Sequence, residues 1–111
     1  MEINKSSAGD VTVVEMSGNL DTNSSIEAQE FFDSLLGDEA QTLLIDFENL
    51  EFITSSGLRV LLGVAKHLGA RNGELRICSL NDMVKEVFEI SGFDTILKVA
   101  ADRDEALSEL S

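Results

Sequence analysis

Apolar residues recur with two periods along this chain, one typical of strands and the other typical of helices. Alternation over residues 11–16 predicts a strand, and the turn at residues 7–10 predicts that this strand forms a hairpin with residues 2–6. A short apolar run within residues 42–47 predicts a further, buried strand.

Two longer segments carry apolar residues at helical spacing. Ser24 and Glu27 have the spacing of a capping box, which predicts that a helix begins there, and Gly37 can end it. A second helix is expected from about residue 56 to residue 70. The expected apolar faces are Ala28, Phe31, Phe32, Leu35 and Leu36 on the first helix, and Leu58, Leu61, Leu62, Ala65 and Leu68 on the second.

The same order of elements recurs in the second half of the chain. A strand is predicted by Leu75 and Ile77, and a helix that stops near Gly92 by Val84, Val87 and Phe88. A last strand is predicted by Ile96, Leu97 and Val99. Asp102 is expected to cap a last helix that carries Ala106, Leu107 and Leu110. After the hairpin, a strand is followed by a helix four times, which predicts right-handed crossovers. We therefore expect one α/β domain over residues 1–111, with a mainly parallel β-sheet, an N-terminal antiparallel strand and about four flanking helices.

The charge of the chain excludes several classes of ligand. Its 8 Lys and Arg residues against 21 Asp and Glu residues give a formal net charge of −13. Nucleic-acid binding depends on neutralising phosphates with Lys and Arg, and anionic membranes would repel the chain in the same way. The chain also has no Trp or Tyr on which single-stranded bases could stack. We expect neither nucleic acid nor membrane as a direct partner.

The start of the chain and its one cysteine indicate a compartment. Residues 1–5 are acidic and polar with no apolar stretch behind them, so we expect no signal peptide. No run of about 18 apolar residues occurs. Cys78 lies in a predicted strand and cannot form an internal disulfide, so we interpret it as a small buried thiol. These features predict a cytoplasmic protein.

Three polar segments are expected to meet at one edge of the sheet. They are residues 17–21, 51–57 and 80–82, each of which follows a predicted strand or leads into a helix. In a mainly parallel sheet, functional groups gather beyond the carboxyl ends of the strands. These segments therefore contain the first candidates for a functional site.

The turn Thr54-Ser55-Ser56-Gly57 has two interpretations. In the first, Ser55 or Ser56 is only an N-cap, which would stabilise the following helix by about 1 kcal/mol. In the second, the turn is a phosphorylation site, because a helix N-terminus offers free N–H donors and the positive end of the helix dipole. A phosphate at this position would change binding without melting the helix beneath it.

Three motifs, in order, resemble the STAS family, and within it the bacterial anti-sigma-factor antagonists. The motifs are Gly18-Asn19-Leu20-Asp21, Leu44-Ile45-Asp46-Phe47, and the stretch from Phe52-Ile53-Thr54-Ser55-Ser56-Gly57 to Leu62. The likeness continues through residues 69–73 to residues 88–93, so it covers nearly the whole chain and implies a STAS domain over residues 1–111.

The resemblance implies a function and a site. An antagonist of this family binds an anti-sigma factor and thereby frees a sigma factor; the anti-sigma factor is typically also a serine kinase, and a serine phosphatase resets the switch. By position, Ser55 is the phosphorylation candidate. The expected partner-binding residues are Asp21, Thr54, Ser55, Ser56, Gly57 and Arg59, and Asp46 is expected to have a structural or surface role.

Thr54 departs from the family pattern, which usually has Asp at this position. The departure removes a carboxylate that would repel a phosphate, so it does not obstruct phosphorylation. It adds a competing hydroxyl and can alter recognition by a kinase. Some family members are never phosphorylated, which leaves open a non-phosphorylated STAS scaffold subunit of a signalling or transporter complex. A nucleotide-binding or other small-molecule role is a third hypothesis.

Catalytic alternatives fit the residues less well. The Ser-containing turn resembles a nucleophile elbow, but Ile53 replaces the first Gly of that motif, and His67 is expected about 18 Å from Ser55 along the helix. One His and one Cys cannot supply a zinc site. Asp21 stands alone where a receiver domain has paired acids, and no Gly-rich phosphate loop occurs. We expect no enzyme activity, no metal and no cofactor.

Acidic and basic residues are segregated along the chain. Between residues 6 and 58 there is no Lys or Arg, whereas eleven acids occur at positions 10, 15, 21, 27, 30, 33, 38, 39, 46, 48 and 51. Residues 56–72 contain Arg59, Lys66 and Arg71 and no acid. These are either solvated helix faces or an acidic rim beside a basic helix at a docking edge, which would steer a partner.

We expect the protein to be a monomer or weak dimer.

Overall fold

The computed structural model describes residues 1–37 and 41–110. Its strands are β1 (Glu2–Ala8), β2 (Val11–Leu20), β3 (Thr42–Asp46), β4 (Leu50–Ile53), β5 (Glu74–Cys78) and β6 (Val99–Ala100). Its helices are α1 (Ser24–Gly37), α2 (Ser55–Gly69), α3 (Asp82–Ser91) and α4 (Arg103–Leu110), with a short 3-10 turn at Phe93–Thr95. Among the described residues, no helix is both long and apolar enough to span a membrane.

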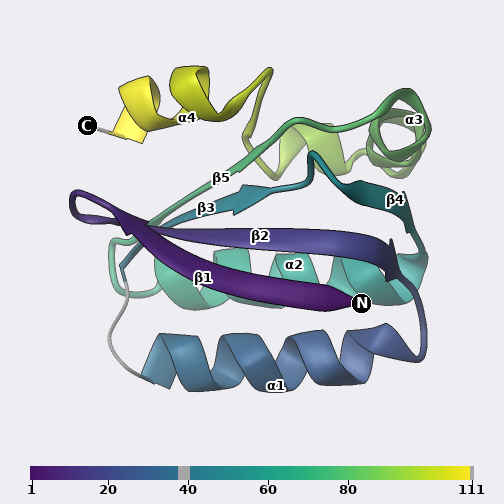
Figure 1. Ribbon diagram of the computed structural model, residues 1–111, viewed down its shortest axis with the longest axis horizontal. Helices are drawn as coiled ribbons and strands as arrows, with labels where there is room; N and C mark the ends of the chain where they lie inside the picture. The colour runs from purple at the N-terminus through teal and green to yellow at the C-terminus, as the bar shows by residue number, and fades with distance from the viewer. Residues whose placement is uncertain (38–40, 111) are drawn as a thin grey trace.

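The predicted fold class is confirmed. The strands form one sheet in the order β1-β2-β3-β5-β6, and β4 pairs with the far end of β2. β1 and β2 are antiparallel, and every other described pair is parallel. Helices α1 and α2 cover one face of the sheet, and α4 lies on the opposite face (Figure 1).

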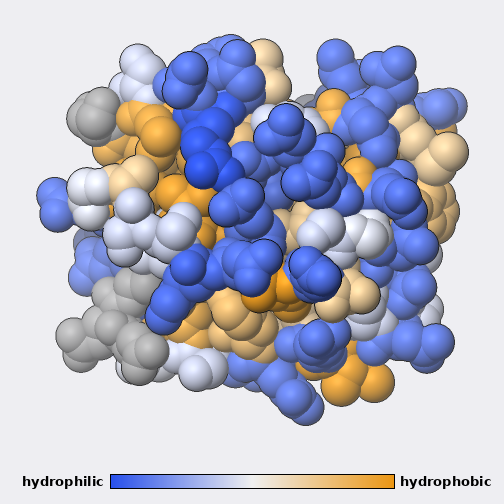
Figure 2. All heavy atoms as spheres, viewed as in Figure 1, coloured by the Kyte–Doolittle hydropathy of each residue, from blue (hydrophilic) through white to orange (hydrophobic). Residues whose placement is uncertain are grey.

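Side-chain alternation along the strands divides the core into two unequal parts. Val14, Met16 and Ile45 belong to the large cluster that also contains the buried side chains of α1 and α2. Val13 and Leu44 point the other way, into a small cluster that includes Ala106 of α4. Figure 2 shows mostly polar side chains on the side where β1 runs, and most residues of this edge strand are exposed. Polar side chains on an edge strand disfavour its pairing with a strand of another molecule.

Two strand predictions were wrong. Residues 50–53 form the strand β4, where no strand is predicted from the sequence. The last strand contains only Val99 and Ala100, because Gly92, with φ 78°, ends α3 and leads directly into the 3-10 turn. Ile96 is 56% exposed rather than part of a buried strand.

The helix predictions were largely confirmed. The buried face of α2 contains Val60 and Val64 in addition to the expected leucines, while Leu62 is only partly buried. Asp102 caps α4 as expected, since its Oδ1 accepts the Glu105 N–H at 2.8 Å. At the start of α1, however, Ser24 is bonded to Asp21 rather than to Glu27.

Candidate functional site

The two loops expected to form the site lie together because β2 and β4 end side by side. Leu20 and Ile53 are paired in the parallel register of these strands. The Thr54 N–H donates to the Leu20 carbonyl at 3.0 Å, which ties the first residue after β4 to the last residue of β2. Asp21 and Thr54 therefore begin two adjacent loops at the carboxyl edge of the sheet.

Helix α2 begins at Ser55, so the prediction that Ser55 or Ser56 is the N-cap was wrong. Thr54 holds the N-cap position in an extended conformation, with φ −107° and ψ 176°, and its side chain makes no capping bond. Its Oγ1 is buried and has no hydrogen-bond partner in the described structure. The Ser55 side chain is exposed, and Ser56 is partly buried. A first-turn position leaves the Ser55, Ser56 and Gly57 N–H groups without acceptors inside the helix.

Gly57 is where α2 comes closest to the sheet. A Cβ atom there would overlap the Leu20 side chain, the Leu20 carbonyl and the Ile53 side chain. Any larger residue would push the N-terminus of α2 away from the ends of β2 and β4. Glycine therefore sets how near Ser55 and Ser56 lie to the Asp21 loop.

Asp21 holds its own loop in place. Its Oδ1 accepts the Ser24 N–H at 3.0 Å, while its N–H donates to Ser24 Oγ at 2.9 Å. The bond from the Ser24 N–H is the main reason why the pKa of Asp21 is lowered. The loop also reaches α2, since Thr22 Oγ1 and Ser56 Oγ are 3.4 Å apart. Thr22 was missed in the sequence because nothing in its neighbourhood distinguishes it from an ordinary loop threonine.

Arg59 lies one turn beyond Ser55 on α2 and is exposed. It lines a groove between the first turns of α1 and α2, together with Thr22, Ser25, Ile26, Gln29, Glu30, Ser56 and Val60. The side chain of Ile26 is 67% exposed, so the groove next to the Ser55 turn has an apolar element that we did not single out in the sequence.

Asn81 connects the third predicted segment to this edge. Its Nδ2 donates to the Leu50 carbonyl at 2.9 Å and to the Glu51 carbonyl at 3.1 Å, and its Oδ1 accepts the Val84 N–H at 2.8 Å. The side chain thus caps α3 and satisfies the otherwise open edge of β4. An Asn immediately before a predicted helix was the available signal for the cap, but the contact with β4 had none.

Asp46 and His67 lie away from the Ser55 turn. Asp46 is 3% exposed and forms a charge-assisted bond with Arg103 of α4, on the opposite face of the sheet. His67 is exposed in the last turn of α2, whereas Ser55 is its first residue. Within residues 1–37 and 41–110, no group of three His, Cys, Asp or Glu side chains is arranged to hold a metal ion.

Comparison with known proteins places the chain in a family. A model of the STAS domain matches residues 2–106. The chain belongs to the STAS domain family. It is 30% identical to the anti-sigma F factor antagonist of Paenibacillus polymyxa over 101 residues, which are 90% of this chain and 86% of the relative. It is 50% identical to BtrV of Bordetella bronchiseptica over 64 residues, which are 58% of this chain and 55% of that relative.

A solved structure with the same fold is that of the Bacillus anti-sigma factor antagonist SpoIIAA in its phosphorylated form. The superposition covers 99% of this chain and 100% of that one, with a TM-score of 0.74 and 22% sequence identity. This STAS chain therefore has the same overall fold as that structure.

Proposed function

We propose that this STAS domain is an anti-sigma-factor antagonist and that phosphorylation of Ser55 switches it off. In its unphosphorylated state it binds a kinase-type anti-sigma factor and so releases a sigma factor, and a serine phosphatase restores it. The observation that carries the proposal is the exposed Ser55 hydroxyl at the first residue of α2, beside the Asp21 loop. The name of the Paenibacillus relative and the phosphorylated SpoIIAA structure support it.

The position of Ser55 makes a phosphate compatible with the fold. A phosphoserine carries a charge of roughly −1.5 to −2 and would sit at the positive end of the α2 dipole. Because Thr54 supplies no capping bond, the first-turn N–H groups face no competing side-chain acceptor from it. The modification therefore leaves α2 intact and changes what a partner meets at this surface.

The switch must act locally. One phosphate changes a formal net charge of −13 by only roughly 2 units. Solvent-exposed charges further apart than about 8 Å are largely screened at physiological salt. A partner that covers Ser55 would have to desolvate the new dianion, and this cost is what releases it.

The surrounding charges orient the partner. Glu27 and Glu30 lie exposed on the first turns of α1, and Arg59 lies exposed on α2, so an acidic rim borders a basic position next to Ser55. Asp38 and Glu39 of the acidic set lie outside the described residues. Such a pattern sets the association rate and the docking orientation more than the affinity.

The experiment that tests the proposal is affinity capture from the native cell, with and without ATP, followed by phosphosite mapping. We expect an ATP-binding anti-sigma factor to be captured and one phosphate to be added at Ser55. Ser55→Ala should keep binding after ATP is added, whereas Ser56→Ala, its matched control, should still be phosphorylated and released. An unmodified Ser55 in a complex that persists with ATP would instead support the non-phosphorylated scaffold.

A further inference from the structure

Helix α4 covers its face of the sheet with few apolar contacts. It contributes one buried residue, Ala106, whereas α2 contributes six. Leu107 and Leu110 are only partly buried against the small cluster. A helix of eight residues is not stable alone in water, so α4 depends on what holds it to the sheet.

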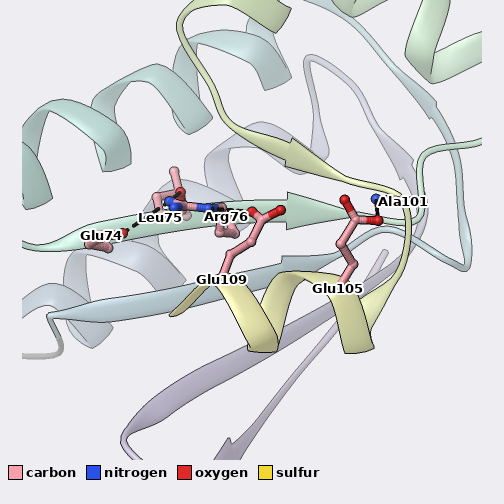
Figure 3. A network of polar contacts seen from close by, with 6 residues as sticks. All are labelled: Glu74, Leu75, Arg76, Ala101, Glu105 and Glu109. Carbon is pink, nitrogen blue, oxygen red and sulfur yellow. Dashed lines mark hydrogen bonds and ion pairs between the residues drawn. The ribbon is translucent and has the colours of Figure 1, made fainter. Parts of the chain in front are cut away.

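Ion pairs hold α4 near both of its ends. At the first end, Arg103 Nη2 lies 2.8 Å from Asp46 Oδ2 and 3.3 Å from Glu15 Oε2. Near the other end, Arg76 Nε of β5 lies 3.0 Å from Glu109 Oε1. Figure 3 shows Glu109 reaching from α4 across to Arg76 on the strand.

These ion pairs differ in their access to water. Arg103 is 37% exposed and Glu109 is 42% exposed, so dissolved ions reach both. Asp46 is 3% exposed, and its Oδ2 pairs with Arg103 of α4. A buried carboxylate that loses its cationic partner is strongly destabilising, so loss of the Arg103 contact favours the state in which water reaches Asp46.

The Cys78 thiol is a probe for exposure of the sheet face beneath α4. It is fully buried and belongs to the same cluster as Ala106, Val13 and Leu44. It is also the only cysteine in the sequence. Separation of α4 from the sheet would bring this thiol into solvent, whereas the large cluster between the sheet and helices α1 and α2 does not include Cys78.

We propose that α4 is a strap that opens as a unit by breaking the Arg103 and Arg76 ion pairs, while the sheet and helices α1–α3 remain folded. Opening exposes the apolar sheet face on the side opposite α1 and α2. Because the contacts that break are ion pairs, the fraction of molecules with this face exposed depends on ionic strength. The device is independent of Ser55, which lies at the start of α2.

The test is the rate at which a neutral maleimide labels Cys78 in the native protein, measured against urea concentration. If the strap opens alone, labelling proceeds faster than global unfolding allows, and its dependence on urea is weaker than that of the circular-dichroism transition. The control is Ala28→Cys in a Cys78→Ala background, because Ala28 of α1 is equally buried but belongs to the large cluster. Labelling of the control should follow global unfolding.

Two further variants test the ion pairs. Arg103→Gln should raise the labelling rate by about tenfold to a hundredfold, since it leaves the buried Asp46 carboxylate without its cationic partner, although Arg103 itself is partly exposed. Glu109→Gln and a rise from about 0.05 M to about 1 M salt should each raise it by about twofold to tenfold. Lys66→Gln, which removes an exposed cation from α2, should not change it. The proposal is overturned if Cys78 and the control cysteine show the same urea dependence, or if Arg103→Gln labels no faster than Lys66→Gln.

Discussion

Gly57 packs directly against Leu20: a Cβ atom on Gly57 would lie 2.7 Å from Leu20 Cγ and 2.8 Å from the Leu20 carbonyl oxygen. Because one of these atoms belongs to the backbone, the neighbour cannot simply rotate away. The contact fixes the distance between the strand that ends at Leu20 and the helix that carries Ser55. It is therefore a relationship on which the geometry of the site depends.

We expect Gly57→Ala to lower the free energy of unfolding by about 1–3 kcal/mol, as overpacking of a filled core position does. Gly63→Ala is the matched control, since it lies on the same helix and has open space around it. That substitution should raise stability by about 0.5–1 kcal/mol through the lower backbone entropy of alanine. Urea unfolding followed by circular dichroism measures both, and equal effects of the two substitutions would contradict the close-packing argument.

Thr54 leaves the N-terminus of α2 without a side-chain cap, so an aspartate there should supply one. We expect Thr54→Asp to stabilise the fold by about 0.5–2 kcal/mol, because its carboxylate can accept a first-turn N–H. Thr54→Val removes only a buried hydroxyl that has no partner, so it should be neutral or slightly stabilising. A loss of more than about 1 kcal/mol for the valine variant would mean that the hydroxyl makes a bond in solution.

Helical periods predicted α1, α2 and α3 from the sequence because each has an apolar face several turns long. The strand β4 escaped prediction for a physical reason. Only its end residues, Leu50 and Ile53, are buried, and the pairing with β2 shifts register between Gly18 and Asn19, so no alternation is visible in four residues.

The site could be predicted in part. The Asp21 loop and the Thr54 turn were expected to meet, because parallel strands end at a common edge. The bonds between Asp21 and Ser24 and the uncapped Thr54 were not predictable, since several nearby hydroxyls compete for the same caps. The close approach of Gly57 to Leu20, which places the start of α2 beside this loop, is likewise visible only in the folded chain.

Asp21 should make the stability of the protein depend on acid pH. Its pKa is lowered from 3.8, first by the bond from the Ser24 N–H, so the folded state binds the proton less readily than the unfolded state. The stabilisation by the Asp21 carboxylate is therefore present at pH values above the pKa of the unfolded state. It is lost as the pH falls through the lower pKa of the folded state. Asp21→Asn should be less stable than the unsubstituted protein at neutral pH.

The difference between Asp21→Asn and the unsubstituted protein should shrink as the pH falls below 3.8. Thermal unfolding at several pH values between about 2 and 7 measures it. Glu86→Gln, on the exposed side of α3, is the control for loss of one negative charge. A difference that stays constant across this range would show that Asp21 acts through the shape of its loop and not through its charge.

A negative charge at Ser55 should weaken binding without weakening the fold, and the two effects can be separated. Ser55→Glu places a carboxylate in the first turn of α2, where the helix dipole favours it by about 0.3–1 kcal/mol. His67→Glu places the same group in the last turn, where the dipole opposes it by a similar amount. The free energy of unfolding, measured with urea, should therefore rise for Ser55→Glu and fall for His67→Glu. Only Ser55→Glu should lose affinity for the captured anti-sigma factor. If Ser55→Glu instead lowered stability as much as His67→Glu does, the switch would operate by loosening α2, and the local desolvation mechanism would be wrong.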